Sequence, residues 1–351
     1  MQDKKLNKRC NDLPPPPPPS KGNVLKQNEV FFSLLIPVYN TESYIARCLE
    51  SCINQSFKDI EILVIDDCGR DNAIEIAKDY ATKDPRIKIF HNPQNLGSFQ
   101  ARIKGIEQAK GEYILCVDSD DFIALETCQK LHERITQDYA SSGVYSDICC
   151  FGMDYYPKTF KRIRPVLISQ TLHKEQILQE FFIKPISPSC QLCSKVLKTS
   201  MLHKSIDFIN TNLPHLPKLV MMEDLLHFFI ITLFAEKSIG LKEYLYFYCD
   251  STSSICRQKT PEITNEKILN LNILIDIFQK LRTICTSHQK AIESIDRLQK
   301  ILKGAAALQY RYKKERFAYL KACITSLQYH KKWETYARII CYFFSLGKLK
   351  F

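Results

Sequence analysis

The stretch FFSLLIPVYNTESYIARCLESCINQSFKDIEILVIDD, residues 31–67, contains the repeating unit that decides the fold. It opens with an apolar run closed by Pro and Asn, which is typical of a buried strand and its exit loop. Apolar residues then recur with the period of a helix, and a second apolar run ends in Asp66 and Asp67. The stretch therefore predicts a strand, a helix and a second strand.

The same alternation continues beyond residue 67. NAIEIAKDYA has helical periodicity, RIKIFHN is typical of a short strand, GSFQARIKGIEQAKG of a helix, and EYILCV of a fourth strand. Alternating strands and helices predict an α/β fold with a mostly parallel sheet flanked by helices. In such sheets ligands bind beyond the carboxyl ends of the strands, where the loops converge on a crevice.

The remaining chain divides by composition. Residues 1–29 include six consecutive prolines and are expected to form a disordered polyproline tail. Residues 30–150 carry the alternating pattern, residues 151–262 are mixed, and helical periodicity dominates residues 263–351. The last range predicts a helical C-terminal extension, in which one stripe of a helix would hold Trp333, Tyr336, Ile340, Phe343 and Phe344.

Charge is concentrated at the C-terminus. The whole chain carries 49 Lys and Arg against 38 Asp and Glu, and residues 300–351 contain 12 of the basic residues but two acids, Glu315 and Glu334. Basic residues interleaved with aromatic ones fit an amphipathic helix on anionic lipid, and they also fit packing of the tail on its own chain. Without a nucleic-acid-binding motif, we expect no nucleic-acid partner.

Localisation is predicted from three negative features. The first residues are polar and charged and do not resemble a signal peptide. The 15 cysteines have no regular spacing, which is typical of reduced thiols. No apolar run has the length needed to cross a bilayer. We therefore expect a cytoplasmic protein, or one that is peripheral on the inner face of the cytoplasmic membrane.

Three aspartates follow the fourth predicted strand, in GEYILCVDSDDF. Asp118, Asp120 and Asp121 would repel one another, and a divalent cation offsets such repulsion directly. A D-x-D spacing by itself is more often a solvated, helix-capping turn. Because Asp66 and Asp67 occupy a second strand end, the sequence favours a site for a nucleotide and Mn²⁺ or Mg²⁺. No GxGxxG follows the first strand and no GxxxxGK[ST] occurs, which disfavours dinucleotide oxidoreductases and P-loop enzymes.

The motifs, in order, resemble family 2 glycosyltransferases of the GT-A fold. The resemblance rests on residues 31–73, on NLGSFQARIKGI and on GEYILCVDSDD, and it continues more weakly through CSKVLKTSML, MMEDLLHFF and YLYFYCDSTSSIC. It implies that residues 30–150 bind a nucleotide-diphosphate sugar and residues 151–262 bind the acceptor. The implied donor is a UDP-sugar, and the implied acceptor is a glycan or a lipid-linked glycan.

The resemblance also implies roles for individual residues. Pro37 and Tyr39 would flank the nucleotide base, Asp67 would hydrogen-bond it, and Asp66 would support the loop. Arg102 would lie near the nucleotide. Asp118 would face the ribose or the donor sugar, or help to hold the metal, and Asp120 would coordinate the metal. Asp121 would be a second ligand or a sugar contact, and the register of the aspartates leaves this open.

A second acidic pair, Glu223 and Asp224, precedes the apolar segment LLHFFII. In isolation the pair is typical of a helix N-terminus stabilised by the helix dipole. The resemblance implies instead that Asp224 is the general base, with Glu223 as its neighbour or substitute. Direct displacement at an anomeric carbon needs a base to remove the acceptor's proton, and the reaction inverts the configuration there.

The predicted function is metal-dependent, inverting transfer of a hexose in the synthesis of cell-surface polysaccharide or lipopolysaccharide. Two other classes remain open. One is a sugar nucleotidyltransferase, which would need a glycine-rich first loop where this chain has PVYNTES. The other is a non-catalytic scaffolding protein that uses its polyproline and basic ends.

Overall fold

The computed structural model describes residues 30–158, 164–185, 187–250, 258, 260–312, 318–329 and 333–344. The chain divides into two compact units. The sheet unit comprises Pro19–Leu219 and Glu223–Ser253, and the helical unit comprises Met1–Pro18, Val220–Met222 and Ser254–Phe351. The predicted polyproline tail, residues 1–29, lies outside the described residues.

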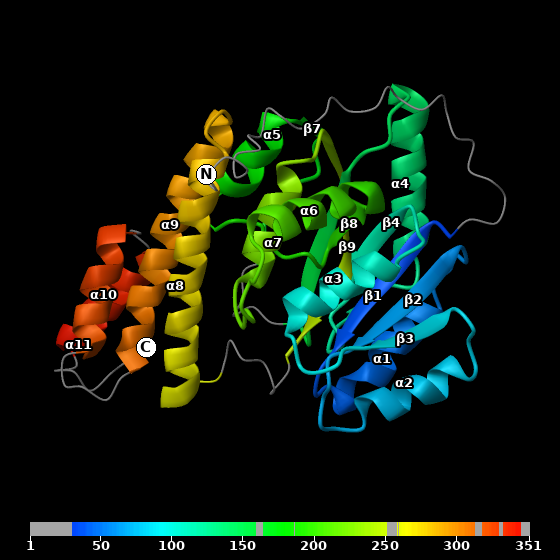
Figure 1. The fold of residues 1–351 in the computed structure, drawn as a ribbon, viewed down its shortest axis with the longest axis horizontal. Coiled ribbons are helices and arrows are strands. Elements are labelled where there is room, and N and C mark those ends of the chain that lie inside the picture. Colours follow the sequence, from blue (N-terminus) through cyan, green and yellow to red (C-terminus); the bar gives the residue numbers. More distant parts are fainter. Residues whose placement is uncertain are drawn as a thin grey trace, which may run out of the picture. The chain divides into compact units, whose positions relative to one another are not determined.

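The first half of the sheet unit is the predicted alternation of strands and helices (Figure 1). Its elements are β1 (Phe32–Val38), α1 (Glu42–Ile53), β2 (Ile60–Asp66), α2 (Ala73–Ala81), β3 (Ile87–His91), α3 (Ser98–Gln108) and β4 (Tyr113–Cys116). β1 pairs in parallel with both β2 and β4, and β2 pairs in parallel with β3. The carboxyl ends of these strands therefore share one edge of the sheet.

The second half completes the sheet with mixed pairings. Its elements are β5 (Phe122–Ile123), α4 (Thr127–Ser142), β6 (Ile148–Tyr156), β7 (Leu172–His173), α5 (Glu175–Leu178), the π-helical turn η2 (Gln179–Ile183), β8 (Lys195–Lys198), α6 (Thr199–Asn212), α7 (Glu223–Thr232) and β9 (Lys237–Cys249). Among the described residues the sheet has nine strands in the order β3-β2-β1-β4-β8-β6-β9-β5, with β7 paired to β9. β8 is antiparallel to β4 and β6, whereas β6 and β9 are parallel.

Helices cover both faces of the sheet because successive strand residues point in opposite directions. Leu34 and Ile36 of β1 lie in one buried cluster with Ile45 of α1. Leu35, between them, faces α3, where a Cβ on Gly105 would lie 2.4 Å from its Cδ1 atom. A glycine at this position therefore lets α3 pack closely on the sheet. The predicted class, an α/β sheet flanked by helices with a helical C-terminal region, is confirmed.

The helical unit contains α8 (Pro261–Ile284), α9 (Gln289–Gln309), the 3₁₀ turn η4 (Tyr310–Tyr312), α10 (Ala318–Tyr329) and α11 (Trp333–Phe344). α8 begins with a capped turn, because the Thr260 hydroxyl accepts a hydrogen bond from the Ile263 amide and Pro261 occupies the first helical position. Among the described residues no helix combines the length and the apolar character that crossing a bilayer requires.

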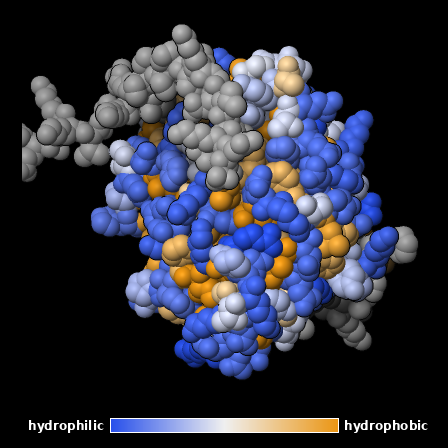
Figure 2. All heavy atoms as spheres, turned by 90° about the vertical axis from the view of Figure 1, so that its right-hand side faces the viewer, coloured by the Kyte–Doolittle hydropathy of each residue, from blue (hydrophilic) through white to orange (hydrophobic). Residues whose placement is uncertain are grey.

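The face drawn in Figure 2 is largely hydrophilic, with apolar residues gathered in separate patches between polar ones. All 13 cysteines among the described residues are free thiols, and most of them are buried.

Candidate functional site

Polar loops from three parallel strands meet at the carboxyl edge of the sheet. Val38 at the end of β1 pairs in register with Asp66 at the end of β2. The loop after β1 also contacts the loop after β4, because the Thr41 hydroxyl donates a 3.0 Å hydrogen bond to the Ser119 hydroxyl. The strand ends therefore bring the predicted nucleotide and metal residues to one edge, as parallel pairing requires.

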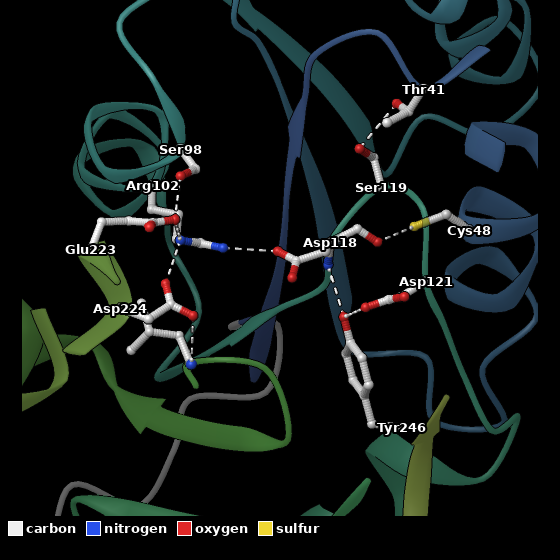
Figure 3. Close-up of polar contacts among 11 residues, drawn as sticks. Thr41, Cys48, Ser98, Arg102, Asp118, Ser119, Asp121, Glu223, Asp224 and Tyr246 are labelled. Atoms are coloured by element: carbon white, nitrogen blue, oxygen red, sulfur yellow. Dashed lines mark hydrogen bonds and ion pairs between the residues drawn. The ribbon is translucent and has the colours of Figure 1, made fainter. Parts of the chain in front are cut away.

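Arg102 of α3 connects two of the predicted groups of carboxylates (Figure 3). Its Nη1 atom donates a 2.6 Å hydrogen bond to Oδ1 of Asp224, and its Nη2 atom donates a 2.8 Å hydrogen bond to Oδ1 of Asp118. Glu223 Oε1 lies 3.5 Å from Nη1. Residues from α3, from the loop after β4 and from the start of α7 therefore converge on one guanidinium.

The environment of Arg102 keeps it charged. Its side chain is 5% exposed, and burial by itself would lower its pKa, but Asp224, Asp118 and Glu223 together raise the pKa well above its usual value. A planar guanidinium can serve two carboxylates at fixed angles, which a lysine ammonium cannot do equally well. Arg102 therefore holds the predicted base and the first aspartate of the D-x-D motif in a fixed relation.

Asp224 has the properties of a general base. Burial, together with the charges of Glu223 and Asp118, raises its pKa to about 6, although Arg102 and the Leu192 amide, which donates to Oδ2 at 3.3 Å, act to lower it. A carboxylate with such a pKa is ionised near neutral pH and still accepts a proton readily. Glu223 is held differently, because the Ser98 hydroxyl donates a 2.5 Å hydrogen bond to its Oε1. Both acids lie in the first turn of α7, as the helix-terminus reading of the sequence also predicts.

The loop after β4 presents Asp118 and Asp120. The Asp118 carbonyl accepts a hydrogen bond from the Cys48 thiol at 3.6 Å, and the Asp120 carbonyl accepts one from Arg47 Nη2 at 3.0 Å. These contacts fix the loop backbone to α1 and leave the Asp118 side chain 28% exposed.

The donor chemistry of this loop fits a hard divalent cation. Within the described part of the chain, no group of three or more His, Cys, Asp or Glu side chains is arranged to hold a metal. A pair of carboxylates suits Mg²⁺ and similar ions, which take few protein ligands and complete their shell with water and substrate phosphates. Asp118 and Asp120 would hold such an ion.

Asp67 organises the loop that leads into α3. Its two carboxylate oxygens accept four hydrogen bonds of 2.8 Å, from the side chains of Asn92 and Asn95 and from the amides of Leu96 and Gly97. Gly97 has a φ of +87°, which favours glycine. The loop-supporting role expected for Asp66 thus belongs to Asp67, and a contact of Asp67 with a base stays a prediction.

The other predicted nucleotide residues lie at the same edge. Asp66 accepts a hydrogen bond from the Cys68 amide at 2.9 Å and contacts His91 Nδ1 at 2.7 Å. Pro37 is half-buried near the end of β1, and the Tyr39 side chain beyond it is 44% exposed. An exposed aromatic ring at this position is available for stacking on a planar base.

Comparison with known proteins identifies the segment that carries this geometry. Residues 33–204 match the model of the family described as glycosyl transferase family 2. This segment is a family 2 glycosyltransferase domain.

A relative from Haemophilus influenzae, described as an uncharacterized glycosyltransferase, is 45% identical over 103 residues, which are 29% of this chain and 41% of the relative. The chain thus matches less than half the length of that curated relative.

Solved structures extend the likeness of the fold beyond the family 2 domain. TarS residues 1–349 from S. aureus, in complex with UDP-GlcNAc, have a TM-score of 0.54 at 19% identity, over 87% of this chain and 91% of that one. The mannosyltransferase PcManGT from Pyrobaculum calidifontis, in complex with GDP-Man and Mn²⁺, has a TM-score of 0.50 at 14% identity, over 91% of this chain and 81% of that one. These likenesses support the predicted GT-A type of fold.

Asp121 occupies a different environment from the other aspartates of the family 2 domain. Its side chain is fully buried, Oδ2 accepts a 2.7 Å hydrogen bond from the Tyr246 hydroxyl, and Oδ1 accepts one of 2.7 Å from the Cys249 amide. Burial and the charges of Asp118 and Asp120 raise its pKa to about 9, against the effect of these two donors. The predicted contact of Asp121 with a cofactor stays a prediction, and its observed partners are both on β9.

Tyr246 is the residue that the sequence pattern indicated least clearly. Its hydroxyl donates to Asp121 and accepts a 3.0 Å hydrogen bond from the Asp118 amide. It lies on β9, beyond the end of the family 2 domain at residue 204. The available signal was the alternation of tyrosines at 244, 246 and 248, which does not say which of them is buried.

Proposed function

We propose that this chain is an inverting, metal-dependent glycosyltransferase that moves a hexose from a nucleotide-diphosphate sugar to a glycan or lipid-linked glycan acceptor. A UDP-sugar is the proposed donor, and the proposed product belongs to a cell-surface polysaccharide or lipopolysaccharide. The observation that carries this proposal is the fixed pairing of Asp224 with Asp118 through Arg102, which links a base to the D-x-D loop.

The proposed reaction is a single displacement. The acceptor hydroxyl oxygen forms a bond to the anomeric carbon while the bond from that carbon to the diphosphate oxygen breaks. Asp224 takes the proton of the hydroxyl, and the nucleoside diphosphate leaves with the electron pair of the broken bond. Because attack comes from the face opposite the leaving group, the configuration at the anomeric carbon inverts.

Each carboxylate has its own part in this proposal. Asp224 is oriented by Arg102 and by the Leu192 amide, so that it does not need to reorganise before it accepts the proton. Glu223 is engaged by Ser98 and takes the place of a supporting neighbour. When bound at Asp118 and Asp120, Mn²⁺ or Mg²⁺ supplies positive charge that stabilises the leaving diphosphate.

The relatives support the proposed donor and metal. The TarS structure contains UDP-GlcNAc, and the PcManGT structure contains GDP-Man with Mn²⁺. Both are nucleotide-diphosphate sugars, and both proteins share the fold of this chain. We take UDP as the nucleotide because the TarS likeness has the higher TM-score.

Calorimetry with UDP and Mn²⁺ tests the proposal, combined with an assay of hydrolysis across a panel of nucleotide sugars. We expect metal-dependent heat with the unchanged protein, weaker UDP binding by Asp120→Asn, and retained UDP binding but lost transfer by Asp224→Asn. Asp79→Asn is the matched control, because Asp79 is exposed on α2. Full UDP binding and transfer by Asp120→Asn would contradict the mechanism, and no metal-dependent heat in the unchanged protein would favour a scaffolding role.

A further inference from the structure

Helix α11 exposes its apolar side. Exposed fractions are 72% for Trp333, 40% for Tyr336, 47% for Ile340, 61% for Phe343 and 88% for Phe344. The spacing of three, four and three residues, with Phe344 next to Phe343, places these side chains along one stripe of the helix.

A different side of α11 packs within the helical unit. Thr335 is fully buried, and the ring of Tyr342 stacks on that of Tyr319 of α10 with centroids 5.6 Å apart. Figure 1 shows α10 and α11 next to each other. The outward aromatic stripe is therefore not the surface that attaches α11 to α10.

A stripe of five exposed apolar side chains is unusual on a soluble surface and marks an interaction site. Trp and Tyr are enriched where one end of a ring contacts apolar material and the other contacts water. A helix of 12 residues is about 18 Å long and so is too short to cross the roughly 30 Å of bilayer hydrocarbon. The helix can instead lie along a membrane surface with its rings in the interface.

Charge complementarity decides the occupant. Residues 300–351 carry 12 Lys and Arg against two acids, and among them the side chains of Lys303 and Lys321 are exposed. Anionic headgroups attract such a region, whereas a second copy of this chain would bring the same excess positive charge to the contact. We propose that the outward face of α11 binds an anionic lipid surface. The proposal does not depend on the proposed transfer reaction.

The sequence provides its own probe, because Trp333 is the single tryptophan of the chain. We expect its fluorescence maximum to move to shorter wavelength when the full chain meets vesicles of phosphatidylcholine and phosphatidylglycerol. Vesicles of phosphatidylcholine alone should give a much smaller shift, and added salt should reverse the effect of the anionic lipid. Brominated lipid should quench the tryptophan.

Two double variants make the test specific. Phe343→Ser with Phe344→Ser removes two apolar rings but keeps the probe, and we expect apparent vesicle affinity to fall by about tenfold or more in cosedimentation. Leu125→Ser with Val144→Ser is the matched control, because these side chains are 54% and 57% exposed in the sheet unit. The control should bind vesicles like the unchanged protein.

Three results would overturn the proposal. One is the absence of any shift and of cosedimentation with anionic vesicles. A second is a shift that appears without lipid as protein concentration rises, which would assign the stripe to self-association. The third is a Trp333 that is already shielded from aqueous quenchers in the dilute protein, which would assign the stripe to packing within the chain.

Discussion

The Tyr246 hydroxyl bridges the two ends of the aspartate loop, accepting a hydrogen bond from the Asp118 amide at 3.0 Å and donating one to Asp121 Oδ2 at 2.7 Å. The loop between these contacts contains Asp120. β9 therefore fixes the loop that is proposed to hold the metal, although β9 follows that loop by more than 100 residues in the sequence.

Removing this hydroxyl should disturb the metal loop without emptying the core. We expect Tyr246→Phe to weaken Mn²⁺-dependent UDP binding and to lower kcat, because the Asp118 amide loses its acceptor and Asp121 loses a donor. The loss of stability should be about 1–3 kcal/mol, because buried polar groups are left unsatisfied. Titration calorimetry and thermal unfolding measure the two effects. Tyr244→Phe, on the same strand and 38% exposed, should be nearly neutral. Equal losses of UDP binding in both variants would show that the bridge has no special role.

The rate of transfer should depend on the ionisation of Asp224. Its pKa is raised to about 6, so the carboxylate is the proton acceptor above that pH and is protonated below it. We therefore expect kcat to rise with pH through about 6 and then to level off. A pH profile with saturating donor and acceptor measures this. An acid limb that persists unchanged in Asp224→Glu, whose geometry and pKa both differ, would assign the limb to another group.

Arg102 should control the position of that acid limb. Its positive charge lowers the pKa of Asp224, so Arg102→Met should move the limb to higher pH and also lower kcat. Arg102→Lys keeps the charge but loses the two-armed geometry, so its limb should move less than that of Arg102→Met while kcat still falls. Pre-steady-state kinetics over a range of pH separate these effects. If both variants kept the original limb, Arg102 would not act on the base.

Asp67 should matter for the order of the loop from residue 92 to residue 97. Replacement by Asn leaves at least one oxygen's worth of donors without an acceptor, because four donors converge on its carboxylate. We expect Asp67→Asn to lower the free energy of unfolding by roughly 1–3 kcal/mol. Chemical denaturation measures this, with Glu75→Gln as an exposed control. A loss no larger than that of Glu75→Gln would mean that the loop holds itself.

The sequence predicted the first four strands and their helices because each is a local pattern. Apolar runs, helical periods and polar strand ends are all contained in short windows, and parallel pairing then brings the strand ends together. Asp224 and Arg102 were named through the family resemblance, and the geometry brings both to one cluster. Their direct ion pair was not predicted, because it joins residues 122 positions apart.

The second half of the sheet was less predictable for the same reason. β8 lies between β4 and β6 and is antiparallel to both, an arrangement set by long-range pairing rather than by any local period. The different environments of Asp120 and Asp121 also could not be read from adjacent identical residues. They follow from the position of Tyr246 on β9, which reaches one carboxylate of the pair.

The location of β9 has a consequence for dividing the gene into expression fragments. A fragment that ends at residue 204, the limit of the family match, would omit α7 and β9. Arg102 would lose Asp224, Asp121 would lose both of its hydrogen-bond donors, and the long edge of β6 would lose its parallel neighbour. The shortest fragment with a chance of folding as the intact protein does therefore extends at least to Cys249, well past the border that sequence similarity draws.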